Sequence, residues 1–191
     1  MITKESTRIG FGGWNAEYRP RMDGGQRSVM RWASIEENDR VLDMDCGGGA
    51  LLIALSGSLR IRACGMSREP GEARQIMEVI DGADIITASP SDIPFRDNSF
   101  DEVFVTRRPG ENLSIQGAAE AERVLRPGGE LIVACRLFPG LRRFFSGGGE
   151  PEMDRRALMR RLQENGFRHI SFRRSGLGGV ITAWKRDAID S

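Results

Sequence analysis

A short apolar strand that runs directly into a glycine-rich turn and a helix constrains the fold of this chain more than any other feature. Residues 40–45 predict the strand, residues 47–49 are three consecutive glycines, and residues 50–56 are helical in composition. Glycine allows positive φ angles and a close approach of the backbone to a ligand. The free N–H groups of a helix N-terminus bind carboxylates or phosphates. The segment therefore predicts either a ligand-binding turn of an α/β protein or a tight structural turn.

The rest of the chain continues this alternation of strands and helices. Further strands are expected at residues 59–64, 85–87, 101–106, 130–136, 167–173 and 180–185, and helices at residues 25–33, 70–80, 114–125 and 153–165. Alternating strands and helices form a mostly parallel sheet that is covered on both faces. The last two strands flank a glycine-rich turn, which is typical of an antiparallel hairpin. We expect ligands to bind beyond the carboxyl ends of the parallel strands.

Length and composition limit the class of protein. A chain of 191 residues forms one domain of ordinary size, expected over 1–191, with an N-terminal lid and helical segment at 1–35 and an α/β core at 40–186. The balance of 28 basic and 27 acidic residues argues against a nucleic-acid binder. No apolar run is long enough for a membrane span, and no secretory signal is visible. The three widely spaced cysteines fit neither disulfides nor a zinc cluster, which favours a reducing cytoplasm and no metal.

Four short segments follow one another in a characteristic order. They are residues 41–49 (VLDMDCGGG), 93–101 (IPFRDNSFD), 122–129 (ERVLRPGG) and 165–167 (NGF), the last followed by the hairpin that ends at Lys185. Together they resemble the class I S-adenosylmethionine-dependent methyltransferases of the type that acts on small molecules. The resemblance implies a Rossmann-like, doubly wound α/β fold, with a mostly parallel seven-stranded sheet and an antiparallel C-terminal hairpin.

The same resemblance implies that S-adenosylmethionine binds over the glycine loop. The positions that match the family's cofactor site are Asp43, Asp45, Cys46, Gly47, Gly49, Gly65, Met66, Ser89, Pro90 and Thr106. Asp43 is expected to orient the glycine loop, and Cys46 is interpreted as a small buried residue. Methyl transfer from a sulfonium runs largely on proximity and in-line orientation. For this reason no catalytic acid or base is assigned.

The expected cofactor site departs from the family's pattern, which makes it a degenerate version of that site. Asp45 stands in place of the leading glycine of the first motif, where its charge repels the carboxylate of the cofactor. Gly65 is interpreted as standing in place of the acid that accepts the ribose hydroxyls, so Gly65→Asp is expected to tighten cofactor binding. Ser89 replaces the acid that meets the adenine amino group, and Pro90 has no N–H to donate to the ring.

The resemblance places the methyl acceptor between the N-terminal segment and the loops that follow the fourth and fifth strands. The candidate substrate-binding residues there are Tyr18, Arg19, Arg107, Arg108, Phe138, Arg142 and Phe144. Arginine binds anionic groups through bidentate contacts, and arginines interleaved with aromatic side chains suit an amphipathic ligand or a protein partner. The alternatives are that the arginines are solvated and that the phenylalanines pack onto a neighbouring helix.

Two hypotheses about function remain open from the sequence. The first is an S-adenosylmethionine-dependent methyltransferase that acts on a small acceptor or on one delivered by a partner. The second is a catalytically inactive binding or regulatory subunit of the same fold, favoured by the departures at Asp45, Gly65 and Ser89. A dinucleotide-dependent oxidoreductase is a weaker third interpretation, because the segments at 93–101 and 122–129 are not typical of that class.

Overall fold

The computed structural model describes residues 21–106, 112–136, 154–175 and 178–187. In chain order the elements are α1 (Gly24–Trp32), β1 (Arg40–Asp43), α2 (Ala50–Ser56), β2 (Arg62–Ser67), α3 (Pro70–Val79), β3 (Asp84–Thr87), β4 (Phe100–Val105), α5 (Ile115–Val124), β5 (Leu125–Arg136), α7 (Arg155–Glu164), β6 (Arg168–Ser175) and β7 (Gly178–Trp184).

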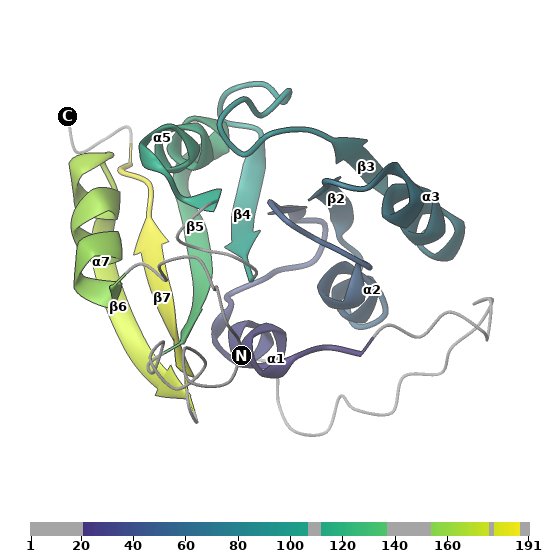
Figure 1. Cartoon of the computed structure of the whole chain (residues 1–191), viewed down its shortest axis with the longest axis horizontal. Coiled ribbons are helices and arrows are strands. Elements are labelled where there is room, and N and C mark those ends of the chain that lie inside the picture. Colours follow the sequence, from purple (N-terminus) through teal and green to yellow (C-terminus); the bar gives the residue numbers. More distant parts are fainter. Residues whose placement is uncertain (1–20, 107–111, 137–153, 176–177, 188–191) are drawn as a thin grey trace, which may run out of the picture.

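The strands form one seven-stranded sheet in the order β3-β2-β1-β4-β5-β7-β6. Strands β1 to β5 pair in parallel, β7 pairs antiparallel with β5, and β6 pairs antiparallel with β7. The sheet runs from β3 beside α3 to the outer strand β6, at opposite sides of the molecule (Figure 1). The predicted fold, a mostly parallel seven-stranded sheet with an antiparallel C-terminal hairpin, is therefore confirmed.

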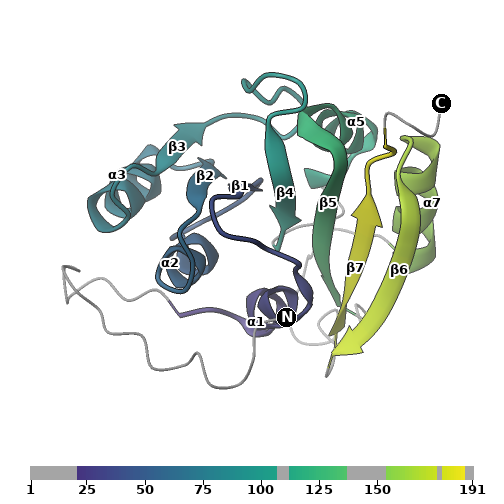
Figure 2. The same cartoon turned by 180° about the vertical axis from the view of Figure 1, so that it is seen from behind.

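Helices cover both faces of the sheet, and the sheet divides the apolar core into two clusters. Helices α1, α2 and α3 lie on one face, and α5 and α7 lie on the other (Figures 1 and 2). One apolar cluster contains Val29 of α1, Leu52 of α2 and Ile76 of α3. The other contains Ala121 of α5 and Leu162 of α7. The apolar positions of each helix thus face the sheet, as helical periodicity predicts.

Strand β2 begins and ends later in the chain than the sequence pattern predicts. The apolar Leu59, expected at the start of this strand, instead packs at the margin of the core before the strand begins. Parallel pairing sets the true limits, because Gly65 lies opposite Asp43 of β1 and Ser67 lies opposite Thr87 of β3. Gly65 is therefore inside the strand, and Ser67 is its last residue.

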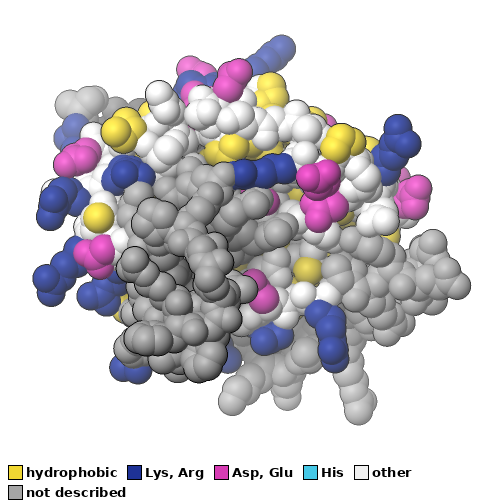
Figure 3. Space-filling view, in the orientation of Figure 1, with side chains coloured by type: hydrophobic (Ala, Val, Ile, Leu, Met, Phe, Trp, Pro, Cys, Tyr) yellow, Lys and Arg dark blue, Asp and Glu magenta, His cyan; other side chains and the backbone are white. Residues whose placement is uncertain are grey.

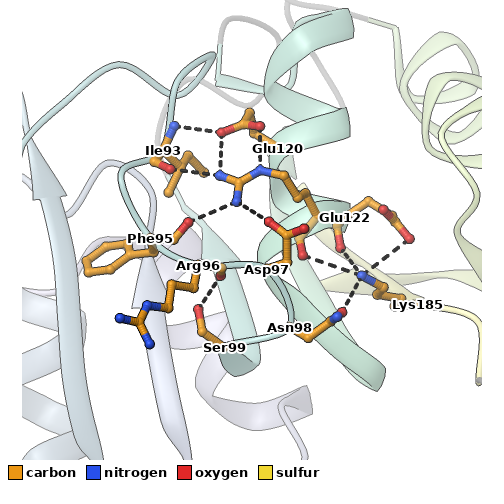
Figure 4. Close-up of polar contacts among 10 residues, drawn as sticks. Ile93, Phe95, Arg96, Asp97, Asn98, Ser99, Glu120, Glu122 and Lys185 are labelled. Carbon is orange, nitrogen blue, oxygen red and sulfur yellow. Dashed lines mark hydrogen bonds and ion pairs between the residues drawn. The ribbon is translucent and has the colours of Figure 1, made fainter.

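Two of the motif segments meet in a polar clamp around Arg123 of α5. Its guanidinium donates to both carboxylate oxygens of Glu120 at 2.7 and 2.8 Å, and to the carbonyls of Ile93 at 2.8 Å and Phe95 at 2.9 Å. A further bond of 2.7 Å reaches Asp97 Oδ1. These bonds engage all five N–H donors of the side chain. They fasten the loop before β4 to helix α5 (Figure 4).

Lys185, just after β7, secures the same region from the C-terminal side. Its Nζ donates to Asn98 Oδ1 at 2.9 Å and to the carbonyl of Glu122 at 2.8 Å (Figure 4). It also lies 3.6 Å from Glu122 Oε1. The loop before β4, helix α5 and the end of the hairpin are thus joined by side chains that belong to the family-like segments.

The charged surface and the cysteines agree with the composition. On the face shown in Figure 3, basic and acidic side chains are interspersed. Cys46, Cys64 and Cys135 are free thiols. None of the helices that the structure describes is both long enough and apolar enough to span a membrane.

Candidate functional site

The candidate site lies at the edge of the sheet where the parallel strands end, next to the point where the strand order reverses between β1 and β4. The glycine loop follows β1 there. Gly47 and Gly49 have φ angles of 50° and 73°. A Cβ at Gly49 would lie 2.6 Å from Ile76 Cγ1, so both the backbone angle and the space require glycine. Two bonds of 2.9 Å, from Cys46 N to the Met66 carbonyl and from Gly49 N to the Cys46 carbonyl, fix the loop.

Asp43 and Cys46 are built into the base of this loop. Asp43 is fully buried, and its Oδ1 accepts a bond of 3.3 Å from the backbone N–H of Asp45. This bond is compatible with the orienting role expected of Asp43, which stays a prediction. Burial, with the nearby charges of Asp43 and Asp45, raises the pKa of the Cys46 thiol far above its usual value. Cys46 is 1 % exposed and belongs to the core.

Asp45 is the first member of a polar chain that crosses the site. It is 2 % exposed, and its Oδ2 accepts a bond of 3.1 Å from Asn112 Nδ2. Asn112 is fully buried, and its Oδ1 accepts a bond of 3.0 Å from Arg68 Nη2. The chain connects the glycine loop, the segment between β4 and α5, and the first residue after β2. The carboxylate of Asp45 is thus joined to an arginine through one amide.

The structure does not support the expected role of Gly65. A Cβ at this position would lie 2.9 to 3.0 Å from Leu52, Cys46 and Ile85, all core residues. An acid here would point into the core and away from any ligand at the strand ends. This geometry argues against the expectation that Gly65→Asp tightens cofactor binding. The expectation arose because the sequence pattern places the end of β2 too early in the chain.

Ser67 occupies the end of β2 instead. Its hydroxyl donates to Glu72 Oε2 at 2.9 Å and contacts the carbonyl of Glu69 at 3.1 Å. Glu72 lies in the first turn of α3 and is half-buried. A carboxylate therefore does stand beside the end of β2, supplied by the following helix in place of the strand.

A hollow of about 460 Å³ opens beside the end of β3. Its lining is Arg68, Thr87, Ala88, Ser89, Pro90, Ser91 and Ser114. Ligand pockets of small molecules commonly have volumes of roughly 300 to 1,000 Å³. The hydroxyl of Ser89 lies 2.8 Å from that of Ser91. The expected cofactor residues Ser89 and Pro90 thus border a space of suitable size, together with Arg68 from the polar chain.

Of the other expected residues, Met66 and Thr106 fall within the described chain. Met66 is a core residue whose side chain is 1 % exposed, so only its carbonyl, which holds Cys46, takes part in the loop. Thr106 directly follows β4 and is 7 % exposed. The predicted substrate residues lie outside the described residues: Tyr18, Arg19, Arg107, Arg108, Phe138, Arg142 and Phe144.

Sequence reasoning missed four residues of this edge: Ser67, Arg68, Glu72 and Asn112. The sequence did carry a signal for Ser67. If Gly65 is matched to the glycine of the family's G-x-D pattern, Ser67 stands in the place of the acid. Nothing in the sequence connects Asn112 with Asp45, since their contact spans 67 positions.

The strand order, the glycine loop after β1 and the antiparallel hairpin define a class I methyltransferase fold. The model of a family described as a methyltransferase domain matches residues 42–133. The match covers a little under half of the chain, and it agrees with the methyltransferase fold of the sheet.

Solved structures support the same fold at low sequence identity. One is a complex of the Trm112 methyltransferase activator with a protein assigned as a methyltransferase from Haloferax volcanii, with a TM-score of 0.74 and 15 % identity over 85 % of this chain and 89 % of that chain. A methyltransferase from Thermotoga maritima gives a TM-score of 0.68 and 19 % identity over 85 % and 88 %. The cyclase SpnF gives a TM-score of 0.68 and 17 % identity over 85 % and 80 %.

Proposed function

We propose that this protein is an S-adenosylmethionine-dependent methyltransferase whose acceptor is a small molecule or a group delivered by a partner protein. The family model that matches residues 42–133 and the glycine loop support the reaction class. The observation that carries the proposal is the Glu72 carboxylate beside Ser67, 2.9 Å from its hydroxyl. It supplies an acid at the edge where the strand itself has none.

The residues at this edge fit the cofactor in two further places. The loop 45–49 has the positive φ angles and close packing that let a backbone pass near a ligand. The hollow beside β3 offers Ser89 and Pro90 to the adenine end. When bound, S-adenosylmethionine supplies a methyl group activated on a sulfonium. The residues of this chain bind the cofactor and orient it toward the acceptor.

Glu72 takes the role that the sequence assigned to Gly65. A carboxylate accepts two hydroxyl groups at once, which suits a ribose. Ser67 donates to Glu72 Oε2 and so holds the side chain at the end of β2. In this proposal the carboxylate that accepts the ribose hydroxyls comes from the first turn of helix α3, whereas the family's pattern places it at the end of the second strand.

The charge of Asp45 is less of an obstacle than the sequence suggests. Asn112 donates a hydrogen bond to Asp45, and Arg68 donates one to Asn112. The negative charge of Asp45 is therefore connected through one amide to the positive charge of Arg68. Arg68 also lines the hollow. We propose that Arg68 offsets the repulsion between Asp45 and the carboxylate of the cofactor.

The route of the acceptor rests on the sequence and on one neighbour. The Haloferax volcanii protein of the same fold is in complex with an activator. We propose by analogy that this chain also works with a partner protein. The cytoplasm as its compartment and one domain over 1–191 also remain proposals.

The inactive subunit is the second candidate, and the same polar chain is the observation that favours it. Asp45, Asn112 and Arg68 are bonded to one another at the centre of the edge. If S-adenosylmethionine does not break these hydrogen bonds, the three side chains occupy the space that the cofactor needs. The cyclase SpnF has a similar fold and bears the name of a different reaction.

Calorimetric titration of two variants with S-adenosylhomocysteine tests the proposed site. Glu72→Gln removes the ribose acceptor, and we expect a loss of affinity of about 10- to 100-fold, because a hydrogen bond to a charged group contributes about 1.5 to 3 kcal/mol. Glu78→Gln, an exposed position on the same helix, is the matched control and should leave affinity unchanged. Equal affinities for both variants would remove Glu72 from the site.

A further inference from the structure

A second cavity lies at the opposite edge of the sheet, where the parallel strands begin. It has a volume of about 150 Å³. It is lined by Ser34, Glu36, Asp39, Asp101, Glu102, Arg126, Gly128, Glu130 and Trp184. Five of these side chains are acidic and one is basic. The cavity is separate from the proposed cofactor site, which lies at the carboxyl ends of the strands.

The acidic side chains of this cavity differ in how many hydrogen-bond and ion-pair partners the protein provides for them. Asp101 accepts a hydrogen bond of 2.6 Å from the backbone N–H of Arg40 and forms an ion pair of 2.6 Å with the guanidinium of Arg126. Asp39 accepts a bond from the backbone N–H of Glu36. The rim acids are therefore held by the protein itself.

Glu102 and Glu130 lie deeper and are not fully satisfied. They face each other across the paired strands β4 and β5 and are 5 % and 4 % exposed. Among the residues that the structure describes, none donates a hydrogen bond to the Oε2 atom of either side chain. Buried acceptors without a donor are rare in folded proteins. Two such atoms lining one cavity indicate that a donor from outside the described chain belongs there.

The groups around the pair determine the charge of that donor. Asp39 and Asp101 add negative charge beside Glu102. Beside Glu130, the facing groups are the backbone of Ser34 and the positive charge of Arg173 on β6. Arg173 also stacks on Trp32 at 4.9 Å. The cavity is therefore short of positive charge mainly on the Glu102 side.

We infer that this cavity binds the primary ammonium group of a small amine through Glu102 and Glu130. An ammonium has three donors and no acceptor, which matches two orphaned carboxylate oxygens and their acidic surroundings. The volume admits a short alkyl chain, since a water molecule occupies about 30 Å³ in the liquid. Trp184 lines the cavity, and indole rings attract cations. Among the residues that the structure describes, no group of three or more potential ligands has the arrangement of a metal site.

Proton release accompanies this binding. Burial raises the pKa of Glu102 to about 9 and that of Glu130 to about 7. An ammonium group that binds the ionised pair displaces these protons into the solvent, so affinity should rise with pH between 6 and 9.

Titration of the full chain with ethylammonium chloride at pH 8.5 tests this inference. Backbone amide shifts of residues 34–39, 101–102 and 128–130 report the location, and calorimetry in two buffers of different ionisation enthalpy reports the released protons. We expect Glu102→Gln and Glu130→Gln each to weaken binding at least tenfold. Glu78→Gln, far from the cavity on α3, should not change it.

Two comparisons within the wild-type protein keep the test independent of whether the variants fold. Tetramethylammonium carries the same charge but has no N–H donor, so it should bind at least tenfold more weakly. Lowering the pH to 6 should weaken ethylammonium binding by a similar factor. Equal binding of both ions, binding that does not depend on pH, or tighter binding of Mg²⁺ with the same shifts would overturn the inference. This test does not depend on whether the chain binds S-adenosylmethionine.

Discussion

Among single residues, Gly65 shows how the end of strand β2 determines the effect of a substitution on stability. A carboxylate at Gly65 would be buried among Leu52, Cys46 and Ile85 without a partner. We therefore expect Gly65→Asp to lower the free energy of unfolding by about 3 kcal/mol or more, since burial of an uncompensated polar group costs this much. Urea unfolding followed by circular dichroism measures the change. Gly71→Asp is the matched control, because Gly71 has open space around it and lies in the first turn of α3, and it should fold as the wild type does.

We also expect that a carboxylate at position 67, the end of β2, can replace the carboxylate of Glu72. Ser67→Asp alone places two acids side by side, because Ser67 touches Glu72. The double variant Ser67→Asp with Glu72→Gln keeps one carboxylate at this edge. We expect it to recover most of the S-adenosylhomocysteine affinity that Glu72→Gln loses. A double variant as weak as Glu72→Gln alone would show that the position of the carboxylate on α3 is essential.

At the scale of elements, the family-like segments hold helices and loops together. Arg123→Lys removes the planar fork that bonds Glu120, Asp97 and two carbonyls at once. We expect a loss of about 2 kcal/mol of unfolding free energy, because lysine does not reproduce bidentate geometry. Arg160→Lys, on the exposed side of α7, is the control and should change little. Unchanged stability in Arg123→Lys would mean that the clamp contributes nothing measurable.

Most elements were predictable from the sequence, for reasons that particular residues make clear. Helix α2 follows the glycine loop as expected, because the angles at Gly49 start it and apolar residues continue it. Strand β2 was misplaced, because the apolar Leu59 outweighed a strand that contains Gly65 and ends in Ser67. Partners in the neighbouring strands set these limits, and no local pattern encodes them. For the same reason the Asp45–Asn112 contact and the role of Glu72 were found only in three dimensions.

At the scale of the whole molecule, the acidic pair sets how stability depends on pH. The pKa values of Glu102 and Glu130 are raised to about 9 and about 7 in the folded protein, above the value of about 4.3 for an unfolded chain. The folded state therefore binds more protons, and stability is lost as the pH rises from about 4.3 through these values. We expect the melting temperature to fall between pH 6 and pH 9. The fall should be smaller in Glu102→Gln than in Glu78→Gln, and equal slopes would contradict this account.

In the proposed function, this edge of the sheet binds S-adenosylmethionine despite an aspartate in its glycine loop. Calorimetric titration of the wild-type protein with S-adenosylmethionine and with S-adenosylhomocysteine measures that binding. Binding in the micromolar range, accompanied by a rise in melting temperature, is the predicted result. The absence of both heat and a thermal shift up to millimolar concentration of either ligand would contradict cofactor binding at this edge. The polar chain of Asp45, Asn112 and Arg68 would then mark a site that no longer takes the cofactor.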